Sequence, residues 1–344
     1  MEELVKLAKE KKASDLHLVY GLKPSVRVHG SLKALDLPVL DDNKLESLAK
    51  ELGVDITNLK EHDMAKTIDN TRCRINVFKQ QNHISIALRL LSDTIPDISV
   101  LGLPKIVEEI IKLRKGIVLV TGETGSGKST TLASLIDAIN HTYEGHIITL
   151  EDPVEYLYKP DKCIINQREV GQDTESFSDG LRASLREDPD IILLGELRDA
   201  DTIETALTAA ETGHLVFATL HTNGAGDTID RIISAVSEGK KDQIRMQLST
   251  TLKYVLAQQL LPRIDSEGRV LAYEVMKVNS AIANLIREGK TPSIQNAIAT
   301  SARIGNITMD NCLINLVKER KISKEEAVLA SNDADYVKNA LNIY

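Results

Sequence analysis

The chain has 344 residues, which at about 150 residues per domain suggests two or three domains. Hydrophobic residues make up 42% and charged residues 27%, a globular composition, and no apolar run is long enough to span a bilayer. The formal net charge of −8 argues against a nucleic-acid-binding protein, because it provides no overall attraction to a phosphate backbone.

The N-terminal part of the chain predicts a small α/β domain with an antiparallel sheet. Its first residues, MEELVKLAKEKK, follow an amphipathic helical pattern and lack the apolar core of a secretory signal, which indicates a cytoplasmic protein. Alternation and turn residues predict the other elements, which are strands over 14–20 and 25–30, a helix over 41–52, and strands over 65–69, 72–79 and 83–91.

Three arginines mark the polar face of this predicted sheet. Alternation places Arg72 and Arg74 on the face opposite Cys73 and Ile75, and Arg89 lies on the polar face of its own strand. Arginines on a solvated sheet face are ordinary. The alternative is that this face contacts ATP from outside the domain that binds it.

Residues 92–104, SDTIPDISVLGLP, contain two prolines and follow no steady period, so we interpret them as a linker. The predicted organisation is an N-terminal domain over 1–92, a linker over 93–104 and a second domain over 105–344. The second domain begins with a helix over 105–114, after which strands and helices alternate as a parallel α/β sheet requires.

A glycine-rich loop follows the strand predicted over 116–121. Residues 122–129 read GETGSGKS and residues 130–140 predict a helix, which is the strand, loop and helix context of a phosphate-binding loop. Its glycines let backbone N–H groups converge on a phosphate chain, Lys128 would reach the β- and γ-phosphates of ATP, and the Ser129 hydroxyl would be a ligand of Mg²⁺. The predicted ATP-binding residues are Gly122, Glu123, Thr124, Gly125, Ser126, Gly127, Lys128, Ser129 and Thr130.

Carboxylates follow the next strand, which is predicted over 147–150. Glu151 and Asp152 come directly after it. Ligands collect at the carboxyl ends of parallel strands, so these side chains would lie near the glycine-rich loop and hold Mg²⁺ or its waters. A solvated acidic turn is the alternative.

The strand predicted over 191–194 ends in Gly195 and Glu196. We expect this strand to lie beside the strand of the glycine-rich loop, where Glu196 would accept a proton from the water that attacks the γ-phosphate. Gly195 occupies the position of the usual Walker B aspartate, which leaves metal coordination to Ser129, water and the acidic cluster.

Two histidines flank the strand predicted over 215–220. His214 and His221 are seven positions apart, roughly 23 Å along a strand, so they cannot both touch one phosphate. His221 lies at the carboxyl end and is the candidate sensor of the γ-phosphate. The alternative for His221 is a core histidine with satisfied hydrogen bonds.

Beyond residue 240 the pattern predicts mostly helices. Apolar residues from Ile244 to Leu256 mark one amphipathic helical face, and further elements are a strand over 269–276 and helices over 280–289, 310–320 and 323–330. Three widely spaced cysteines argue against a disulfide framework or a four-cysteine zinc site, and we expect buried thiols at Cys73, Cys163 and Cys312.

Four successive strand ends carry the motifs GETGSGKS (122–129), IITLEDPVE (147–155), IILLGELRD (191–199) and TGHLVFATLHT (212–222). This series resembles the Walker A, Asp box, Walker B and His box of the type II/IV secretion ATPase superfamily, in which glycine also replaces the Walker B aspartate. Within it, ASDLHL (13–18), RINVFKQ (74–80) and AIANLIRE (281–288) resemble the pilus retraction (PilT) family. The family signature AIRNLIRE has an arginine where this chain has Ala283.

The resemblance implies an α/β fold with an N-terminal PAS-like domain and a C-terminal RecA-like P-loop ATPase domain that ends in helices. It implies a homohexamer that hydrolyses ATP with Mg²⁺ to drive type IV pilus retraction. Its partner would be an inner-membrane pilus platform protein, through which alone the chain would associate with the cytoplasmic face of the inner membrane, without nucleic acid. Candidate contacts to the nucleotide or a neighbouring subunit are Arg72, Arg74, Arg89, Arg198 and Arg231.

Three other functions stay open on the sequence. A pilus-extension or type II secretion ATPase is disfavoured because the chain lacks the paired-cysteine zinc insertion of those relatives. A nucleic-acid translocase on the same core should show basic pore loops and hydrolysis that DNA stimulates. A regulatory partner would bind nucleotide without meaningful turnover.

Overall fold

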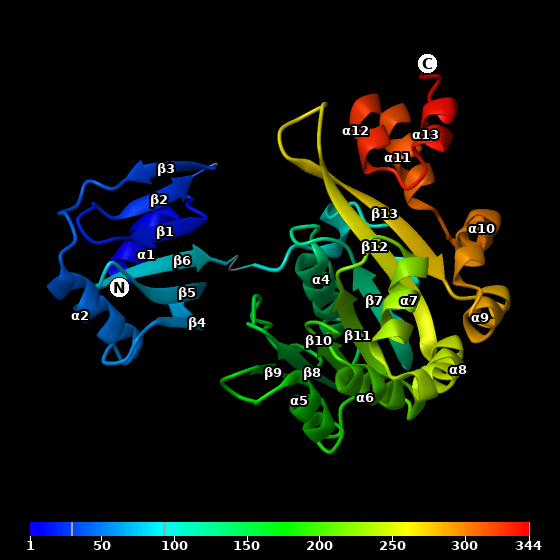
Figure 1. Ribbon diagram of the computed structural model, residues 1–344, viewed down its shortest axis with the longest axis horizontal. Helices are drawn as coiled ribbons and strands as arrows, with labels where there is room; N and C mark the ends of the chain where they lie inside the picture. The colour runs from blue at the N-terminus through cyan, green and yellow to red at the C-terminus, as the bar shows by residue number, and fades with distance from the viewer. Residues whose placement is uncertain (29, 92–93, 344) are drawn as a thin grey trace. The chain divides into compact units, whose positions relative to one another are not determined.

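The computed structural model describes residues 1–28, 30–91 and 94–343. Its chain divides into two compact units, Met1–Ile95 with Pro153–Leu157, and Pro96–Asp152 with Tyr158–Tyr344 (Figure 1). The predicted domain boundary at residues 92 and 93 lies outside the described residues.

The N-terminal unit is an antiparallel sheet covered by two helices. Its strands lie in the order β3-β2-β1-β6-β5-β4, and each neighbouring pair is antiparallel, as predicted. In chain order the elements are α1 (Glu2–Glu10), β1 (Asp15–Leu18), β2 (Ser25–Val28), β3 (Ser31–Ala34), α2 (Asp42–Leu52), β4 (Glu61–Ile68), β5 (Thr71–Gln80) and β6 (His83–Leu90).

Alternation along β5 builds the core of this unit. Cys73, Ile75 and Val77 are buried, in one cluster with residues of α1 and α2, as predicted. Helix α2 starts at Asp41, whose carboxylate accepts a hydrogen bond from the Lys44 amide at 2.8 Å and so satisfies one of the free N–H groups of the first turn. Because one face of the sheet is covered, the polar residues of β5 and β6 occupy the other.

The C-terminal unit is a largely parallel sheet with helices on its faces. Its elements are α3 (Val107–Ile110), β7 (Gly116–Thr121), α4 (Lys128–Asn140), β8 (His146–Glu151), β9 (Ile164–Glu169), α5 (Phe177–Ser184), β10 (Ile191–Leu194), α6 (Ala200–Glu211), β11 (Leu215–Leu220), α7 (Ala225–Ala235), α8 (Lys241–Thr251), β12 (Leu252–Pro262), β13 (Arg269–Lys277), α9 (Ser280–Arg287), α10 (Ile294–Thr300), α11 (Met309–Lys318), α12 (Lys324–Ala330) and α13 (Ala334–Ala340). This α/β architecture with a helical C-terminal part matches the prediction.

The strand order β13-β12-β7-β11-β10-β8-β9 decides which residues meet at the sheet edge. Every neighbouring pair from β12 to β9 is parallel, and only β13 runs antiparallel to its neighbour. The four strands β7, β11, β10 and β8 are therefore contiguous and end at one edge. The expectation that Glu196 follows a strand beside β7 is wrong, because β11 lies between β7 and β10 and pairs with both.

The predicted helical face from Ile244 to Leu256 is only partly correct. Helix α8 ends at Thr251, and from Leu252 the chain enters β12, which pairs with β7 on one side and β13 on the other. Most of β12 is buried, so it shows no alternation and its apolar run resembles a helix face. Only Val107–Ile110 of the helix predicted over 105–114 is α-helical.

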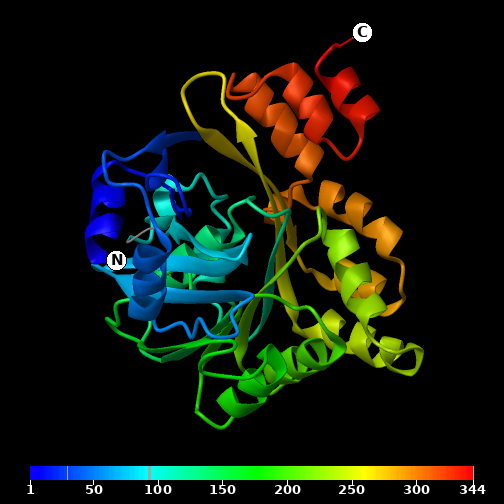
Figure 2. The same cartoon turned by 60° about the vertical axis from the view of Figure 1, so that its left-hand side comes forward.

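Helices α11, α12 and α13 pack together against β12 and β13, around Leu261, Ala272 and Leu313 (Figure 2). Cys73, Cys163 and Cys312 are free and buried, which confirms the prediction of buried thiols. Within residues 1–28, 30–91 and 94–343, every helix is too short or too polar to cross a bilayer.

Candidate active site

The loop between β7 and α4 has the backbone that its glycines predict. Gly122, Gly125 and Gly127 have φ values of +140°, +83° and +92°, which residues with a Cβ atom rarely adopt. A Cβ atom at Gly122 would also lie 2.3 Å from the Gln258 carbonyl oxygen and 2.6 Å from Ser126 Oγ. Gly122 is therefore required both by its conformation and by the space around it.

Lys128 closes this loop on itself. Its side chain is 9% exposed, and Nζ donates hydrogen bonds to the carbonyl oxygens of Gly122 at 2.7 Å and Glu123 at 2.9 Å. The ammonium group is thus held against the backbone that would surround a phosphate chain.

Two buried hydroxyls beside the loop fit a phosphate ligand. Ser126 Oγ and Thr121 Oγ1 are buried without a hydrogen-bond partner among the described residues. A buried hydroxyl without a partner is costly, so it favours a ligand that supplies one. The N-cap residue of α4 is Gly127, which has no side chain to cap the helix, so the positive end of α4 is left to an anion. The residues present therefore fit a nucleotide phosphate chain.

The oxygen atoms available to Mg²⁺ belong to Ser129 and to the carboxylates that end β8. Ser129 is exposed in the first turn of α4, and Glu151 Oε1 accepts hydrogen bonds from Thr149 Oγ1 at 2.6 Å and Gln167 Nε2 at 3.3 Å. The part of the chain that the structure describes holds no cluster of three or more His, Cys, Asp or Glu side chains suited to a metal. This is compatible with Mg²⁺, which keeps several waters and binds through one or two protein groups and the substrate phosphates.

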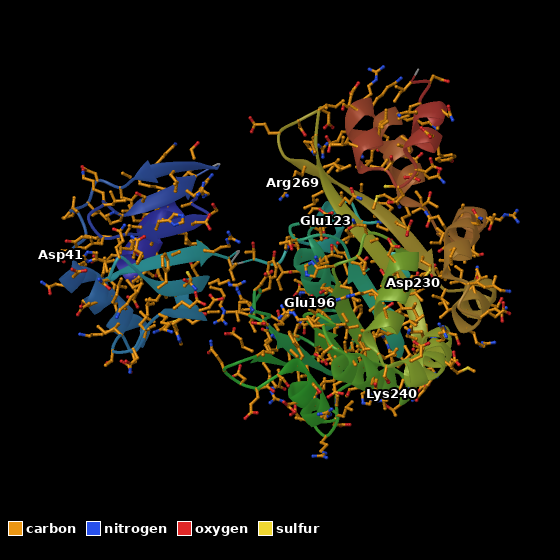
Figure 3. All side chains as sticks on the ribbon, in the orientation of Figure 1. Asp41, Glu123, Glu196, Asp230, Lys240 and Arg269 are labelled. Atoms are coloured by element: carbon orange, nitrogen blue, oxygen red, sulfur yellow. The ribbon has the colours of Figure 1, made fainter. Side chains whose placement is uncertain are left out.

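A polar network joins the ends of β8, β10 and β11. Arg198 Nε donates to Glu196 Oε2 at 2.7 Å, and Arg198 Nη1 lies 3.5 Å from Asp152 Oδ2. The other oxygen of Glu196 lies 3.6 Å from His221 Nε2 (Glu196 is labelled in Figure 3). Arg198 therefore brings the predicted base together with one carboxylate of the acidic cluster, and the predicted sensor joins them through Glu196.

A pocket of about 310 Å³ opens beside this network. Its wall is formed by Glu196, Leu197, Arg198, Leu220, His221 and Arg231. Two of the five candidate arginines, Arg198 and Arg231, are thus in the same pocket as Glu196 and His221. Lys128 and Glu151 do not line it, although the strands that precede them end at the same sheet edge.

The absence of an aspartate at position 195 has a packing explanation. A Cβ atom at Gly195 would lie 3.3 Å from the Leu150 carbonyl oxygen and 3.4 Å from both Glu151 Cα and Phe177 Cζ. The Gly195 amide donates to the Leu150 carbonyl at 2.8 Å, and Thr219 Oγ1 donates to the Gly195 carbonyl. A side chain at position 195 would therefore be tightly packed against the β8 backbone, which would have to move by a few tenths of an ångström.

The other three candidate arginines lie on the polar face of the N-terminal sheet. Arg74 and Arg89 are directly opposite each other on β5 and β6. Burial would raise the pKa of Asp15, but hydrogen bonds from Ser14 and Arg89 hold it below its usual value. The contacts are Arg72 Nε to the Val154 carbonyl at 3.2 Å, Arg74 Nη2 to Asp63 Oδ2 at 2.7 Å, and Arg89 Nε to Asp15 Oδ1 at 3.0 Å.

Three further residues contact the loop or α4, although no sequence motif indicated them. Asn223 Nδ2 donates to Glu123 Oε1 at 3.4 Å, and Arg269 Nη1 lies 3.5 Å from the Gly125 carbonyl oxygen (Figure 3). Gln258 exchanges hydrogen bonds with Thr131 Oγ1 at 2.9 and 3.2 Å. Each contact joins positions at least 100 residues apart, so only the fold reveals it.

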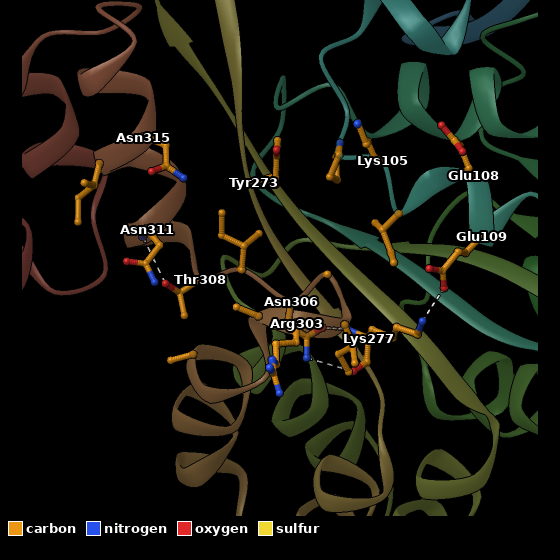
Figure 4. Close-up of a pocket in the computed structure, with 18 of the residues that line it drawn as sticks. Lys105, Glu108, Glu109, Tyr273, Lys277, Arg303, Asn306, Thr308, Asn311 and Asn315 are labelled. Carbon is orange, nitrogen blue, oxygen red and sulfur yellow. Dashed lines mark hydrogen bonds and ion pairs between the residues drawn. The ribbon is translucent and has the colours of Figure 1, made fainter.

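A larger hollow of about 1080 Å³ lies elsewhere in the C-terminal unit, between α3, β13 and α11 (Figure 4). Lys277 Nζ and Glu109 Oε2 form an ion pair of 2.5 Å in its wall, and Tyr273 and Asn311 are also part of it. No residue predicted to bind or hydrolyse ATP lines this hollow, so it is separate from the candidate active site.

Comparison with known proteins finds similarity over most of the chain. The family model described as type II/IV secretion system protein matches residues 61–340. The type IV pilus retraction ATPase PilT of Pseudomonas aeruginosa is 43% identical over 331 residues, which cover 94% of this chain and 96% of that protein. A twitching motility protein of Neisseria gonorrhoeae is 42% identical over 317 residues, 88% of this chain and 83% of that protein.

A solved structure shares the fold over nearly the whole chain. The crystal structure of the pilus retraction motor PilT with bound ADP superposes with a TM-score of 0.91 at 45% identity, covering 98% of this chain and 99% of that one. The α/β fold with a RecA-like ATPase domain is therefore common to both proteins.

Proposed function

Because the chain belongs to the type II/IV secretion system protein family, we propose that it is a motor ATPase that hydrolyses ATP to ADP and phosphate to power type IV pilus retraction. The observation that carries the proposal is the glycine-rich loop with Lys128 at one end of a strand edge that also holds Glu196 and His221. Near full-length similarity to a protein named as a pilus retraction ATPase supports the direction of the work.

The loop and Lys128 bind the substrate in this proposal. Backbone N–H groups of residues 122–130 surround the β- and γ-phosphates, and Lys128 exchanges its two carbonyl contacts for phosphate oxygens. Ser129 supplies a hydroxyl to Mg²⁺, with Glu151 acting through a water molecule. The metal neutralises the charge that develops on the phosphates.

Glu196 and its neighbours supply the chemistry. Glu196 takes a proton from the attacking water, whose oxygen bonds to the γ-phosphorus as the bond to the bridging oxygen of ADP breaks. Arg198 holds one carboxylate oxygen of Glu196 at 2.7 Å, so the oxygen toward His221 is the one available to the water. His221 then reports whether the γ-phosphate is present, and Asp152 orients Arg198.

The organisation around this site is part of the same proposal. Residues 1–92 form the PAS-like domain, 93–104 the linker and 105–344 the ATPase domain, and the chain works as a homohexamer. Arg72, Arg74 and Arg89 contact the nucleotide or a neighbouring subunit, as do Arg198 and Arg231. The assembly acts at the cytoplasmic face of the inner membrane, on a pilus platform protein.

Deletion of the gene and complementation test the direction of the work. Surface pili are counted by electron microscopy in the deletion strain and after return of the wild-type chain or the Lys128→Ala variant. We expect excess pili in the deletion strain, correction by the wild-type chain and no correction by Lys128→Ala. Loss of pili on deletion would assign the chain to extension instead.

A further inference from the structure

Glu274 is a buried carboxylate in the C-terminal unit, outside the pocket described above. It lies on β13 and its side chain is 0% exposed. Its oxygens accept hydrogen bonds from the Ala225 amide at 2.8 Å, from Gln295 Nε2 at 3.1 Å and from the Met309 amide at 3.4 Å. Those donors belong to α7, α10 and α11, three helices that are labelled in Figure 1. One side chain therefore joins three helices.

Helix α7 has no N-terminal side-chain cap of its own, and Glu274 acts as its cap. The N-cap residue is Gly224, which has no side chain to bond the first N–H groups of the helix. Glu274 Oε1 takes that place, and a Cβ atom built on Gly224 would lie 3.5 Å from it. A carboxylate at a helix N-terminus is also favoured by the helix dipole. The start of α7 is therefore fixed from β13.

The start of α7 directly follows the segment 221–224, which begins with His221 at the end of β11. Ala225 is four residues after His221, and Asn223 between them bonds to Glu123 of the glycine-rich loop at 3.4 Å. Thr228 Oγ1 donates a hydrogen bond to the Gly224 carbonyl oxygen at 2.7 Å, which also stabilises the start of α7. Helix α7 carries Arg231, which lines the pocket with Glu196.

The other oxygen of Glu274 faces the C-terminal helices. Gln295 is in the first turn of α10, and Met309 is the first residue of α11. Both donate to Oε2, while Ala225 donates to Oε1. A shift of α10 or α11 thus pulls on the same carboxylate that sets the position of α7.

We propose that Glu274 is a positioning residue of the ATPase site, which places His221 and Arg231 through α7 and links their placement to the packing of α10 and α11. The inference rests on the proposed ATP hydrolysis. This role requires both carboxylate oxygens of Glu274 to act as acceptors, because three donors converge on them. A glutamine would turn an NH₂ group toward at least one of those donors.

The test compares Glu274→Gln with a matched control, Glu109→Gln. Glu109 is also in the C-terminal unit, and its Oε2 accepts hydrogen bonds from Tyr254 Oη at 2.9 Å and Lys277 Nζ at 2.5 Å. Its side chain contacts no residue of α7, α10 or α11 in the hydrogen bonds of the described chain. Each purified protein is assayed for kcat and KM of ATP hydrolysis, for binding of a fluorescent ATP analogue, and for thermal unfolding.

We expect Glu274→Gln to lower kcat about tenfold or more with analogue affinity kept within about twofold, since a misplacement of ~1 Å can cost up to ~10² in rate. Glu109→Gln, which weakens the contacts to Tyr254 and Lys277, should leave kcat at the wild-type value. If the wild-type chain hydrolyses ATP, an unchanged kcat in Glu274→Gln overturns this inference and leaves the proposed function standing. An equal loss of kcat in Glu109→Gln also overturns it, because the effect would then not be specific to the carboxylate that bonds α7.

A second variant covers the case in which Glu274→Gln does not fold. Gln295→Ala removes one half-buried donor and leaves the carboxylate, and the exposed Asn296→Ala on the same helix is its control. We expect a lower kcat for Gln295→Ala and no change for Asn296→Ala. Equal kcat for both variants contradicts the link to α10. A wild-type chain without ATP turnover would remove the proposed function itself.

Discussion

At the scale of single residues, two glycines shape the active site for different reasons. Gly122 has a φ of +140° and lies against the Gln258 carbonyl, so conformation and space both require it. Gly195 is favoured by space alone, because the β8 backbone lies 3.3–3.4 Å from where its Cβ would be. We expect an aspartate there to press on β8 and to shift Glu196.

This packing predicts the cost of Gly195→Ala. We expect the free energy of unfolding to fall by about 1–3 kcal/mol, the usual effect of overpacking, with a loss of ATP turnover as Glu196 shifts. Urea denaturation and a hydrolysis assay measure both. Gly239→Ala is the control, because nothing lies within 4 Å of a Cβ atom at Gly239. Equal stability of the two variants would contradict this reading of Gly195.

Motif residues could be placed from the sequence, and their partners could not. The loop residues, Glu196 and His221 were predicted because each follows a short apolar run, and such a run indicates where a buried strand ends. Asn223, Arg269 and Glu274 were missed, since their contacts join positions 21 to 144 residues apart in sequence. Such contacts depend on strand order, which no local pattern encodes. Roles for the predicted residues stay predictions until they are measured.

At the scale of elements, the buried strands of the parallel sheet differ in how well the sequence predicts them. Strands β7, β10 and β11 were predicted with their observed bounds, because each is a short apolar run between turn signals. Strand β12 was taken for helix because α8 runs directly into it, with no turn residue between Thr251 and Leu252. The insertion of β11 between β7 and β10 was equally hidden, since parallel neighbours need not be consecutive.

The junction of α11 with α13 predicts a pH effect on stability. Burial raises the pKa of Asp310, against hydrogen bonds from Asn332 and Asp333 that lower it. A carboxyl whose pKa is higher in the folded state than the unfolded value of 3.8 stabilises the fold fully below that pH. That contribution is lost as the pH rises through the folded pKa.

Asp310→Asn should therefore flatten the fall in stability as the pH rises from about 4 toward neutrality. Thermal unfolding across this range measures the slope. Asp335→Asn, at a side chain that is 90% exposed, serves as the control and should keep the wild-type slope. A steeper slope in Asp310→Asn would show that the sign of the Asp310 contribution is wrong.

At the scale of the whole molecule, the two units carry complementary chemistry. The C-terminal unit holds the phosphate-binding loop, and the N-terminal sheet presents Arg72, Arg74 and Arg89 on its polar face. An α/β ATPase with a second small domain was evident from motifs and alternation. The assembly of several copies was implied only by resemblance, because no local sequence pattern shows which surfaces of a chain contact another copy.

An arginine supplied to a phosphoryl-transfer site is worth roughly 10³ to 10⁵ in rate. We therefore expect alanine at one of Arg72, Arg74 and Arg89 to reduce ATP turnover by about 10³ while the purified protein still binds nucleotide. Arg27→Ala is the control, because Arg27 lies near the same Asp15 carboxylate, at 3.7 Å. Normal turnover in all three variants would mean that none of these arginines acts in phosphoryl transfer. Arg198 and Arg231 would then remain as the candidates.

The most direct test of the central claim is ATP binding and hydrolysis by purified wild-type, Lys128→Ala and Glu196→Gln proteins with Mg²⁺, with and without DNA. The account predicts turnover by the wild-type chain that DNA does not stimulate, no productive binding by Lys128→Ala, and binding by Glu196→Gln with turnover reduced by about 10² to 10⁴. Near-normal hydrolysis by Glu196→Gln would contradict the assignment of the catalytic base at the end of β10.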